Sequence, residues 1–307
     1  MIQKFTTLFK DVTRQGTKIP KEEYLTHGKN IIIDQGQDII AGYTNCEDGI
    51  FKKIPAIVFG DHTRIIKYVD TPFFLGADGV KVLKCTDKNA NYRYLYYALK
   101  NAHIPNTGYN RHFKWLKEIT INYPDKNRQN DIVNILDKLE YIIKMKSQEL
   151  DKFDELIKAR FVEMFGDPQD SKSKWKKSTI EKCCTLKSGK TLPRNIENEG
   201  GNIPYVKVKD MNSLENTTYI TTSTRFVSDK TANKSIFPVG TVIFPKRGGA
   251  IGTNKKRLTK VPICADLNIM GVIPDNTRIS SYYLFEYFNM VDLDKYDWEC
   301  WSKKSAS

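Results

Sequence analysis

The chain has 307 residues, a length that predicts two domains, each large enough to bury a core. Its 49 Lys and Arg residues outnumber 36 Asp and Glu residues and give a net charge of +13, which either favours a polyanionic partner or only confers solubility. No apolar run reaches the length of a membrane span, and the N-terminal residues lack the apolar core of a signal peptide. We therefore expect a cytoplasmic protein without a membrane partner.

The first part of the chain, residues 1–127, predicts a mixed α/β domain with many short strands. Runs rich in β-branched residues and bounded by Gly, Asp or Pro predict strands, and a run with apolar residues at helical spacing predicts a helix. The predicted strands are 30–34, 55–60, 63–69 and 79–84, and the predicted helix is 91–101.

Residues 128–165 contain no Gly or Pro and predict one unbroken helix. Apolar residues recur along it in steps of four and three, the spacing of a helix face that meets a partner helix. We call the following residues the seam: Leu136, Leu139, Ile143, Leu150, Phe153 and Ile157. Lys146 and Arg160 interrupt this face. A connector helix packed on a neighbouring domain and a coiled-coil arm both fit the pattern.

The third part, residues 166–307, begins with a linker over 166–178 that is rich in Gly, Pro, Ser and Lys. It then predicts a second mixed α/β domain by the same criteria. The predicted strands are 203–209, 240–245 and 268–273, and the predicted helix is 281–290.

The two flanking parts resemble each other, which predicts an internal duplication. The offset between matching positions grows steadily along the chain while their order is kept, as in two copies of one domain with different loop lengths. The matches pair 6–20 with 178–193, 56–60 with 241–245, Ala77-Asp78 with Ala265-Asp266, and Tyr94-Leu95 with Tyr283-Leu284. The first copy continues through 108–124 into the long helix, whereas nothing similar follows Met290. We therefore expect the second copy to be incomplete at its C-terminal end.

The positive charge lies in the two copies. Residues 1–127 carry 19 Lys and Arg against 13 Asp and Glu, the helix 7 against 8, and residues 166–307 carry 23 against 15. The net charges are thus +6, −1 and +8. A nearly neutral helix between two basic domains suggests that the domains meet a polyanion and the helix meets protein.

Catalytic signatures are mostly absent from the sequence. It contains no nucleotide-binding glycine loop, no zinc-protease motif and no nucleophile elbow, and its cysteines lack paired metal-ligand spacing. We expect no cofactor, no metal and no catalytic residue. One string, Asn202-Ile203-Pro204-Tyr205, is similar to the Asn-Pro-Pro-Tyr motif of amino-methyltransferases, but its second residue is Ile, and Pro204-Tyr205 entering a strand is the better explanation.

Basic and polar residues on turns form the strongest functional signal. Arg, Lys and Asn side chains bind phosphates and the edges of guanine and adenine, although each can also be an ordinary surface residue. In the first copy the candidates are His62, Thr63, Arg64, Asn110, Arg111, His112 and Lys114. In the second copy they are Lys246, Arg247, Asn254, Lys255, Lys256 and Arg257, on the corresponding turn.

Several strings together resemble the specificity subunit of type I restriction-modification enzymes. They include IVFGDHTR at 57–64, GYNRHFKWLKEI at 108–119 and ARFVEMFGDP at 159–168. The resemblance implies an α+β fold in which two target-recognition domains, each reading half of a split DNA site, are joined by a coiled-coil-type helix. It also implies that the chain is not an enzyme and that its partners are double-stranded DNA, methyltransferase (modification) subunits and a restriction/translocase subunit.

The missing end departs from the family pattern, in which a second long helix packs against the first. The chain is therefore expected to be a truncated form, and self-association through residues 128–165 would restore a helix pair. Two other functions stay open: a self-sufficient DNA methyltransferase, and a scaffold or inactive remnant.

Overall fold

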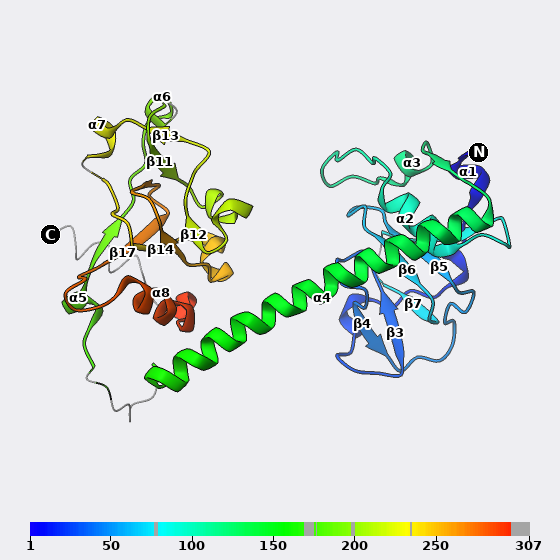
Figure 1. Cartoon of the computed structure of the whole chain (residues 1–307). Helices are drawn as coiled ribbons and strands as arrows, with labels where there is room; N and C mark the ends of the chain where they lie inside the picture. Colours follow the sequence, from blue (N-terminus) through cyan, green and yellow to red (C-terminus); the bar gives the residue numbers. More distant parts are fainter. Residues whose placement is uncertain (77–78, 169–174, 176, 198–199, 234, 296–307) are drawn as a thin grey trace. The chain divides into compact units, whose positions relative to one another are not determined.

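The computed structural model describes residues 1–76, 79–168, 175, 177–197, 200–233 and 235–295. The chain divides into two compact units, unit 1 (Met1–Ser147) and unit 2 (Gln148–Ser307). Helix α4, Lys126–Phe165, begins in unit 1 and ends in unit 2 (Figure 1). The predicted unbroken helix is confirmed and starts slightly earlier than residue 128.

Unit 1 contains a four-stranded antiparallel sheet with the order β2-β8-β5-β6. Its strands are β2 (Phe9–Asp11), β5 (Ala56–Gly60), β6 (Ile66–Val69) and β8 (Val80–Cys85). Every residue of β5 is buried, and its Ala-Ile-Val-Phe-Gly sequence suits a central strand covered on both faces.

A three-stranded sheet lies in the same unit, with the order β4-β3-β7. Strand β3 (Asn30–Ile33) pairs antiparallel with β4 (Gly42–Thr44) and parallel with β7 (Phe73–Leu75). Strand β7 was not among the predicted strands, because its short Phe-Phe-Leu run has no alternation of apolar and polar residues to mark it.

Short helices and one strand pair complete unit 1. Helix α2 (Tyr92–Lys100) is capped by the Asn91 side chain, which accepts hydrogen bonds from the Arg93 and Tyr94 amides. The other elements are α1 (Phe5–Leu8), α3 (Phe113–Leu116), the 3-10 helices Thr13–Gln15 and Lys21–Glu23, and the antiparallel pair of β1 (Ile2–Lys4) with β9 (Thr120–Asn122).

Unit 2 repeats this strand connectivity. Its larger sheet has the order β10-β17-β14-β15-β12, and its smaller sheet the order β13-β11-β16. The strands are β10 (Cys184–Ser188), β11 (Ile203–Val206), β12 (Tyr219–Ile220), β13 (Phe226–Val227), β14 (Val242–Pro245), β15 (Arg257–Thr259), β16 (Cys264–Ala265) and β17 (Ile269–Pro274). The helices are α5 (Ile180–Cys183), α6 (Arg194–Glu197), α7 (Asp229–Ala232) and α8 (Ser281–Met290), with 3-10 helices at Asp210–Asn212, Leu214–Asn216, Gly248–Thr253 and Leu293–Lys295.

The pairing pattern supports the predicted duplication. Strands β2, β8, β5 and β6 correspond to β10, β17, β14 and β15, and all these neighbours are antiparallel in both units. In the smaller sheets, β3 and β11 each have one parallel and one antiparallel neighbour. Helix α1 leads directly into β2, and α5 leads directly into β10. The match of Ala77-Asp78 lies outside the described residues.

Two predicted strands are shorter in the structure, for a local reason. The predicted strand 63–69 begins only at Ile66, because Arg64 has a left-handed backbone (φ 63°) and its amide donates to Gly60 O. The predicted strand 203–209 ends at Val206, where the Lys207 amide donates to the Asp210 carboxylate and starts a turn. In both places the polar end of the run belongs to a turn.

Candidate nucleic-acid interface

The connection between β5 and β6 carries His62, Thr63 and Arg64. The Thr63 hydroxyl donates to Gln35 O (2.6 Å), and the His62 amide donates to the Gln35 side-chain oxygen (3.1 Å). Gly79 makes this contact possible, since its backbone has φ 90° and a Cβ there would collide with the Gln35 side chain. Arg64 is half-buried, and its guanidinium donates to Ile104 O (3.1 Å). The turn is therefore held in place by two other segments of unit 1.

A buried pair, Asp61 and His112, fastens the segment 105–114 to this turn. The Asp61 carbonyl accepts hydrogen bonds from the His112 amide (2.8 Å) and from His112 Nδ1 (3.0 Å), and the Asp61 carboxylate accepts from the Phe113 amide (2.7 Å). Both residues are less than 5% exposed. The other His112 ring nitrogen faces the Thr107 amide and hydroxyl. His112 thus serves the packing of unit 1 and has no surface to offer a ligand.

The polar side chains on either side of His112 are exposed. Asn110 and Arg111 precede it, and Lys114 lies in α3 with its ammonium 4.9 Å from the Trp115 ring centroid. Thr63 on the β5–β6 turn is also exposed. Because Asp61 and His112 bond to each other, the structure brings the predicted residues 62–64 and 110–114 together, although about fifty residues separate them in the chain.

In unit 2 the connection from β14 to β15 carries the corresponding basic residues, but several point inward. Lys246 is 3% exposed, and its ammonium donates to the Ser188 hydroxyl (2.6 Å). Lys256 is 4% exposed and donates to Val291 O (2.6 Å) and to the Asn254 side chain (2.7 Å). Burial lowers the pKa of Lys256 to about 8, although Asp292 partly opposes this shift.

The remaining residues of this connection are more accessible. Asn254 is exposed and has a left-handed backbone (φ 51°). Lys255 is half-buried and its ammonium donates to the Asn212 side chain. Arg257 is half-buried, donates to Asn216 O (2.5 Å) and to Lys256 O (2.7 Å), and has its pKa lowered by burial. Arg247 is half-buried at the start of the connection. Asn254, Lys255 and Arg247 are thus the residues of this group best placed to meet a ligand.

The methyltransferase-like string proves to be part of a core. Tyr205 in β11 is fully buried, and its hydroxyl donates to Lys190 O (3.0 Å). Burial raises the pKa of Tyr205 to about 12. Pro204 is also buried, so the strand explanation of this string is confirmed.

Within the described ranges, no group of three or more His, Cys, Asp or Glu residues is placed to hold a metal ion. Among the helices in the part of the chain that the structure describes, none is both long enough and apolar enough to span a membrane.

Comparison with known proteins identifies the family. The sequence matches the type I restriction modification DNA specificity domain over residues 7–152 and again over residues 172–296. The chain belongs to this family. The two matches fall on the two copies of the fold, so the predicted duplication is confirmed, and so is the predicted α+β architecture of two mixed domains joined by a long helix.

The chain is also similar to a curated protein in sequence and to a solved structure in fold. The chain is 25% identical over 274 residues to the type I restriction enzyme EcoR124I/EcoR124II specificity subunit of Escherichia coli. That alignment spans 82% of this chain and 65% of the E. coli subunit. The fold is similar to the crystal structure of the type I restriction-modification system S subunit from M. genitalium, with a TM-score of 0.57 and 20% identity over 100% of this chain and 80% of that one.

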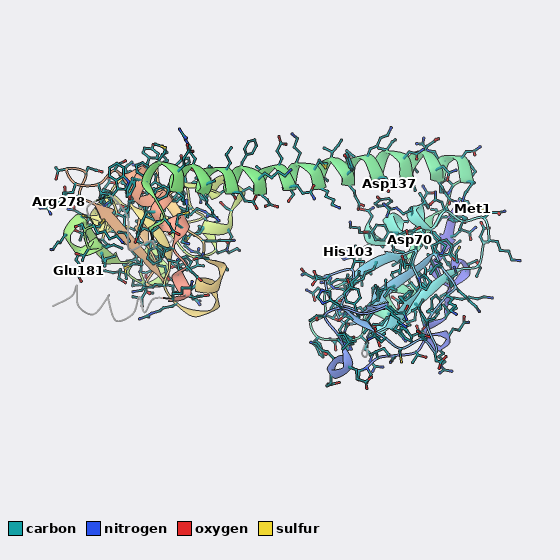
Figure 2. The ribbon with its side chains drawn as sticks, turned by 90° about the horizontal axis from the view of Figure 1, so that it is seen from below. Met1, Asp70, His103, Asp137, Glu181 and Arg278 are labelled. Atoms are coloured by element: carbon teal, nitrogen blue, oxygen red, sulfur yellow. The ribbon has the colours of Figure 1, made fainter. Side chains whose placement is uncertain are left out.

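The seam of α4 is the second surface of interest in this family member. Leu136 is half-buried and packs against the core of unit 1, whereas the other five seam residues are 49–69% exposed. Every side chain from Tyr141 to Arg160 is exposed, and Figure 2 shows side chains projecting on opposite sides of this part of the helix. The helix therefore carries an apolar face that the described residues of this chain leave open.

Sequence reasoning missed three residues that build the unit 1 part of the candidate interface. Gln35 and Asp61 position the turn and the 105–114 segment through contacts between distant parts of the chain, which no local pattern reveals. Tyr109 lies within a string noted for its basic residues, yet its 86% exposure and its contact with His62 appear only in three dimensions.

Proposed function

We propose that this chain is the DNA-binding specificity subunit of a type I restriction-modification complex. It directs methylation and cleavage by partner subunits to a DNA site made of two separated halves. One observation carries the proposal: two copies of the family's specificity domain each place predicted DNA-contacting residues on the connection between equivalent strands, β5–β6 and β14–β15. The positive charge of both flanking parts supports contact with a polyanion.

Under this proposal each unit reads one half of the site. In unit 1 the exposed residues Thr63, Asn110, Arg111 and Lys114 contact DNA directly, and in unit 2 Arg247, Asn254 and Lys255 do so. The buried residues His112, Lys246 and Lys256 shape the surface, because their polar atoms bond within their own unit. His62, Arg64 and Arg257 are half-buried, and we assign them to neither group.

The proposal assigns the chemistry to the partners. The chain itself takes no catalytic role and binds no cofactor, and it acts in the cytoplasm, where its DNA lies. Methyltransferase subunits supply methylation, and a restriction/translocase subunit supplies cleavage. Helix α4 is the natural surface for protein partners, since its net charge is near zero and its seam is apolar.

Methylome sequencing tests the function. A host carrying this chain and its methyltransferase subunit is compared with a host carrying the methyltransferase subunit alone. We expect one split motif to be methylated only when both are present. Methylation at the same sites without this chain would overturn the proposal, and so would a motif that stays unchanged when the two units are exchanged for those of another family member.

A substitution then separates base reading from phosphate binding in unit 1. Arg111→Ala should weaken binding to the methylated motif by about 1 to 3 kcal/mol and relax specificity at one position if Arg111 contacts a base. If it contacts phosphate, the affinity for all duplexes falls alike. The slope of log affinity against log salt concentration then becomes shallower by about one. Lys152→Ala removes one exposed charge from α4 and serves as the matched control.

We also propose that the open seam of α4 pairs with the same helix of a second copy of the chain. The seam repeats in steps of four and three, the spacing that two helices need to pack side by side. Light scattering at micromolar concentration should show a dimer, and Phe153→Glu, which places a charge on the seam, should give a monomer. A wild-type chain that stays monomeric would refute this pairing and leave the DNA-binding proposal intact.

A further inference from the structure

Tyr109 is the most unusual side chain on the unit 1 surface. It is 86% exposed, although burying an aromatic ring of this size is favourable. It follows Gly108, whose backbone has φ 78°, a conformation that glycine adopts without strain. The segment therefore holds an aromatic ring out in solvent among the polar residues proposed to contact DNA.

The ring is ordered by a stack on His62. The two ring centroids are 4.7 Å apart, and the ring planes differ by only 9°. Since Tyr109 is so exposed, one face of its ring covers the imidazole and the other is open to solvent. The His62 Nδ1 atom is shielded from water and has no hydrogen-bond partner within the described residues. An imidazole in this state acts as a flat support for the tyrosine ring.

The segment that carries Tyr109 is fixed at both ends of its turn. The Asn110 side-chain amide donates to Thr107 O (2.5 Å), and the His112 amide donates to Asp61 O (2.8 Å). The turn that carries His62 is also fixed, because the His62 amide donates to the Gln35 side-chain oxygen. A surface that is already ordered loses little conformational entropy when a ligand binds, which favours a binding role over an accidental exposure.

We propose that Tyr109, supported by His62, is a stacking site for a nucleobase in the half-site read by unit 1. Every base has a flat face that stacks on aromatic side chains, and apolar side chains can enter a base step of duplex DNA and unstack it. Asn110 and Arg111 lie next to Tyr109 in the chain and are exposed, so they can bond to the edge of the same base or to its phosphate. This inference rests on the proposed function.

The first test selects DNA from a duplex library with a randomised centre. The wild-type chain with its methyltransferase subunit is compared with Tyr109→Ala, Tyr109→Phe and the control Tyr282→Ala, which removes another exposed tyrosine, from α8. We expect the wild type, Tyr109→Phe and Tyr282→Ala to enrich the same split motif. Tyr109→Ala should lose base preference in one half only, with affinity for the wild-type motif about 5- to 100-fold lower.

The outcomes distinguish this inference from the proposed function. If the wild type enriches no motif, both are overturned. If it enriches a motif that Tyr109→Ala enriches equally well, only the stacking site is overturned. Loss of methyltransferase-subunit binding by Tyr109→Ala, with DNA affinity of the chain alone unchanged, would show that Tyr109 meets protein and would also overturn it.

A fluorescent base gives a second readout that a purely structural role would not change. 2-Aminopurine is placed at each position of the affected half-site, where its fluorescence rises if stacking on its neighbours is broken. We expect a rise at one position with the wild type and Tyr109→Phe and no rise with Tyr109→Ala. His62→Ala should reduce the rise, because the tyrosine ring loses its support. No rise at any position with the wild type would contradict insertion of the ring.

Discussion

The two ends of helix α4 are attached to their units by different chemistry. In unit 1, the Asp137 carboxylate accepts hydrogen bonds from Arg93 (2.5 Å) and Tyr97 (2.6 Å) of α2, and Glu140 pairs with Lys100 (3.1 Å). Asp137 lies on the side of α4 that faces unit 1 (Figure 2). In unit 2, the Phe161 and Phe165 rings pack against Tyr283 of α8, with centroids 5.3 and 4.9 Å apart.

The residues that pack beside each attachment, which we call the closing layer, differ as well. In unit 1, Leu116, Ile121 and Val133 fill the space next to α1 and α2 and are at most 7% exposed. In unit 2, a cavity of about 840 Å³ borders the equivalent helices α5 and α8, and its lining includes Phe161, Phe165, Trp175, Ile180 and Tyr287. In unit 1 a strand and the start of α4 thus close this region, whereas the described residues of unit 2 leave a cavity there. Stability should therefore depend on this layer more in unit 1.

The largest effect is expected from Leu116→Ala, which removes a fully buried side chain from the closing layer of unit 1. We expect a loss of about 2 to 5 kcal/mol, the usual cost of such a cavity. Hydrogen exchange of the β5 amides reports on unit 1, and exchange of the β14 amides reports on unit 2. Only β5 should become less protected.

A matched control is Leu214→Ala, which shortens a leucine of unit 2 that is 92% exposed. It should change stability by at most about 0.5 kcal/mol. If Leu116→Ala were as mild as this control, the segment 113–124 would not be part of the unit 1 core, and the contrast between the two units would disappear.

A second, smaller effect concerns Lys256 in unit 2. Its folded-state pKa of about 8 lies below the ordinary lysine value of 10.5, because burial disfavours the charged form. Between these two values the unfolded chain holds a proton that the folded chain has released, so folding becomes more favourable as pH rises. Relative to Lys256→Met, the wild type should gain about 1 to 3 kcal/mol from pH 7 to pH 10 in urea unfolding.

Lys209→Met, which removes an exposed lysine of unit 2, controls for the loss of one positive charge. If the difference between wild type and Lys256→Met were the same at both pH values, the ammonium of Lys256 would not be buried in solution. Lys256 would then return to the set of residues available to DNA.

Local patterns in the sequence predicted the elements that local chemistry determines. Helix α4 follows from a long run without Gly or Pro, and β5 from a run of β-branched and aromatic residues between turn residues. The repeat predicted that β14 corresponds to β5, and Ile57 and Val242 do occupy the same position, each paired with a residue of β8 or β17. Repetition thus carried information about topology that propensity alone lacks.

The direction of a basic side chain could not be predicted in this way. Lys256 is buried because Val291, 35 residues later, offers a carbonyl, and His112 is buried because Asp61, 51 residues earlier, accepts its bonds. Lys114 and Arg111 look no different in sequence and remain exposed. Whether a cation on a turn faces solvent depends on long-range partners, so the predicted interface included residues that the fold uses internally.

The smallest effect tests the polar attachment of α4 to unit 1. Burial alone would raise the pKa of Asp137, but hydrogen bonds from Tyr97 and Arg93 outweigh it, and the pKa is lowered. A carboxylate with a lowered folded-state pKa adds stability above its ordinary pKa, and this stability is lost as pH falls through the folded-state value. Because the Asp137 side chain is 41% exposed and screened by solvent, Asp137→Asn should cost only about 1 kcal/mol at pH 7.

Urea unfolding at pH 7 and pH 3, with and without 1 M NaCl, measures this contribution. The difference between wild type and Asp137→Asn should shrink toward pH 3 and in high salt, since both remove the attraction between the carboxylate and Arg93. Phe165→Leu in unit 2 should show no such salt dependence, because its contact with Tyr283 is between uncharged rings. A cost of Asp137→Asn that persisted in full at pH 3 would mean that shape rather than charge attaches α4 to unit 1, and the two ends of the helix would then be alike.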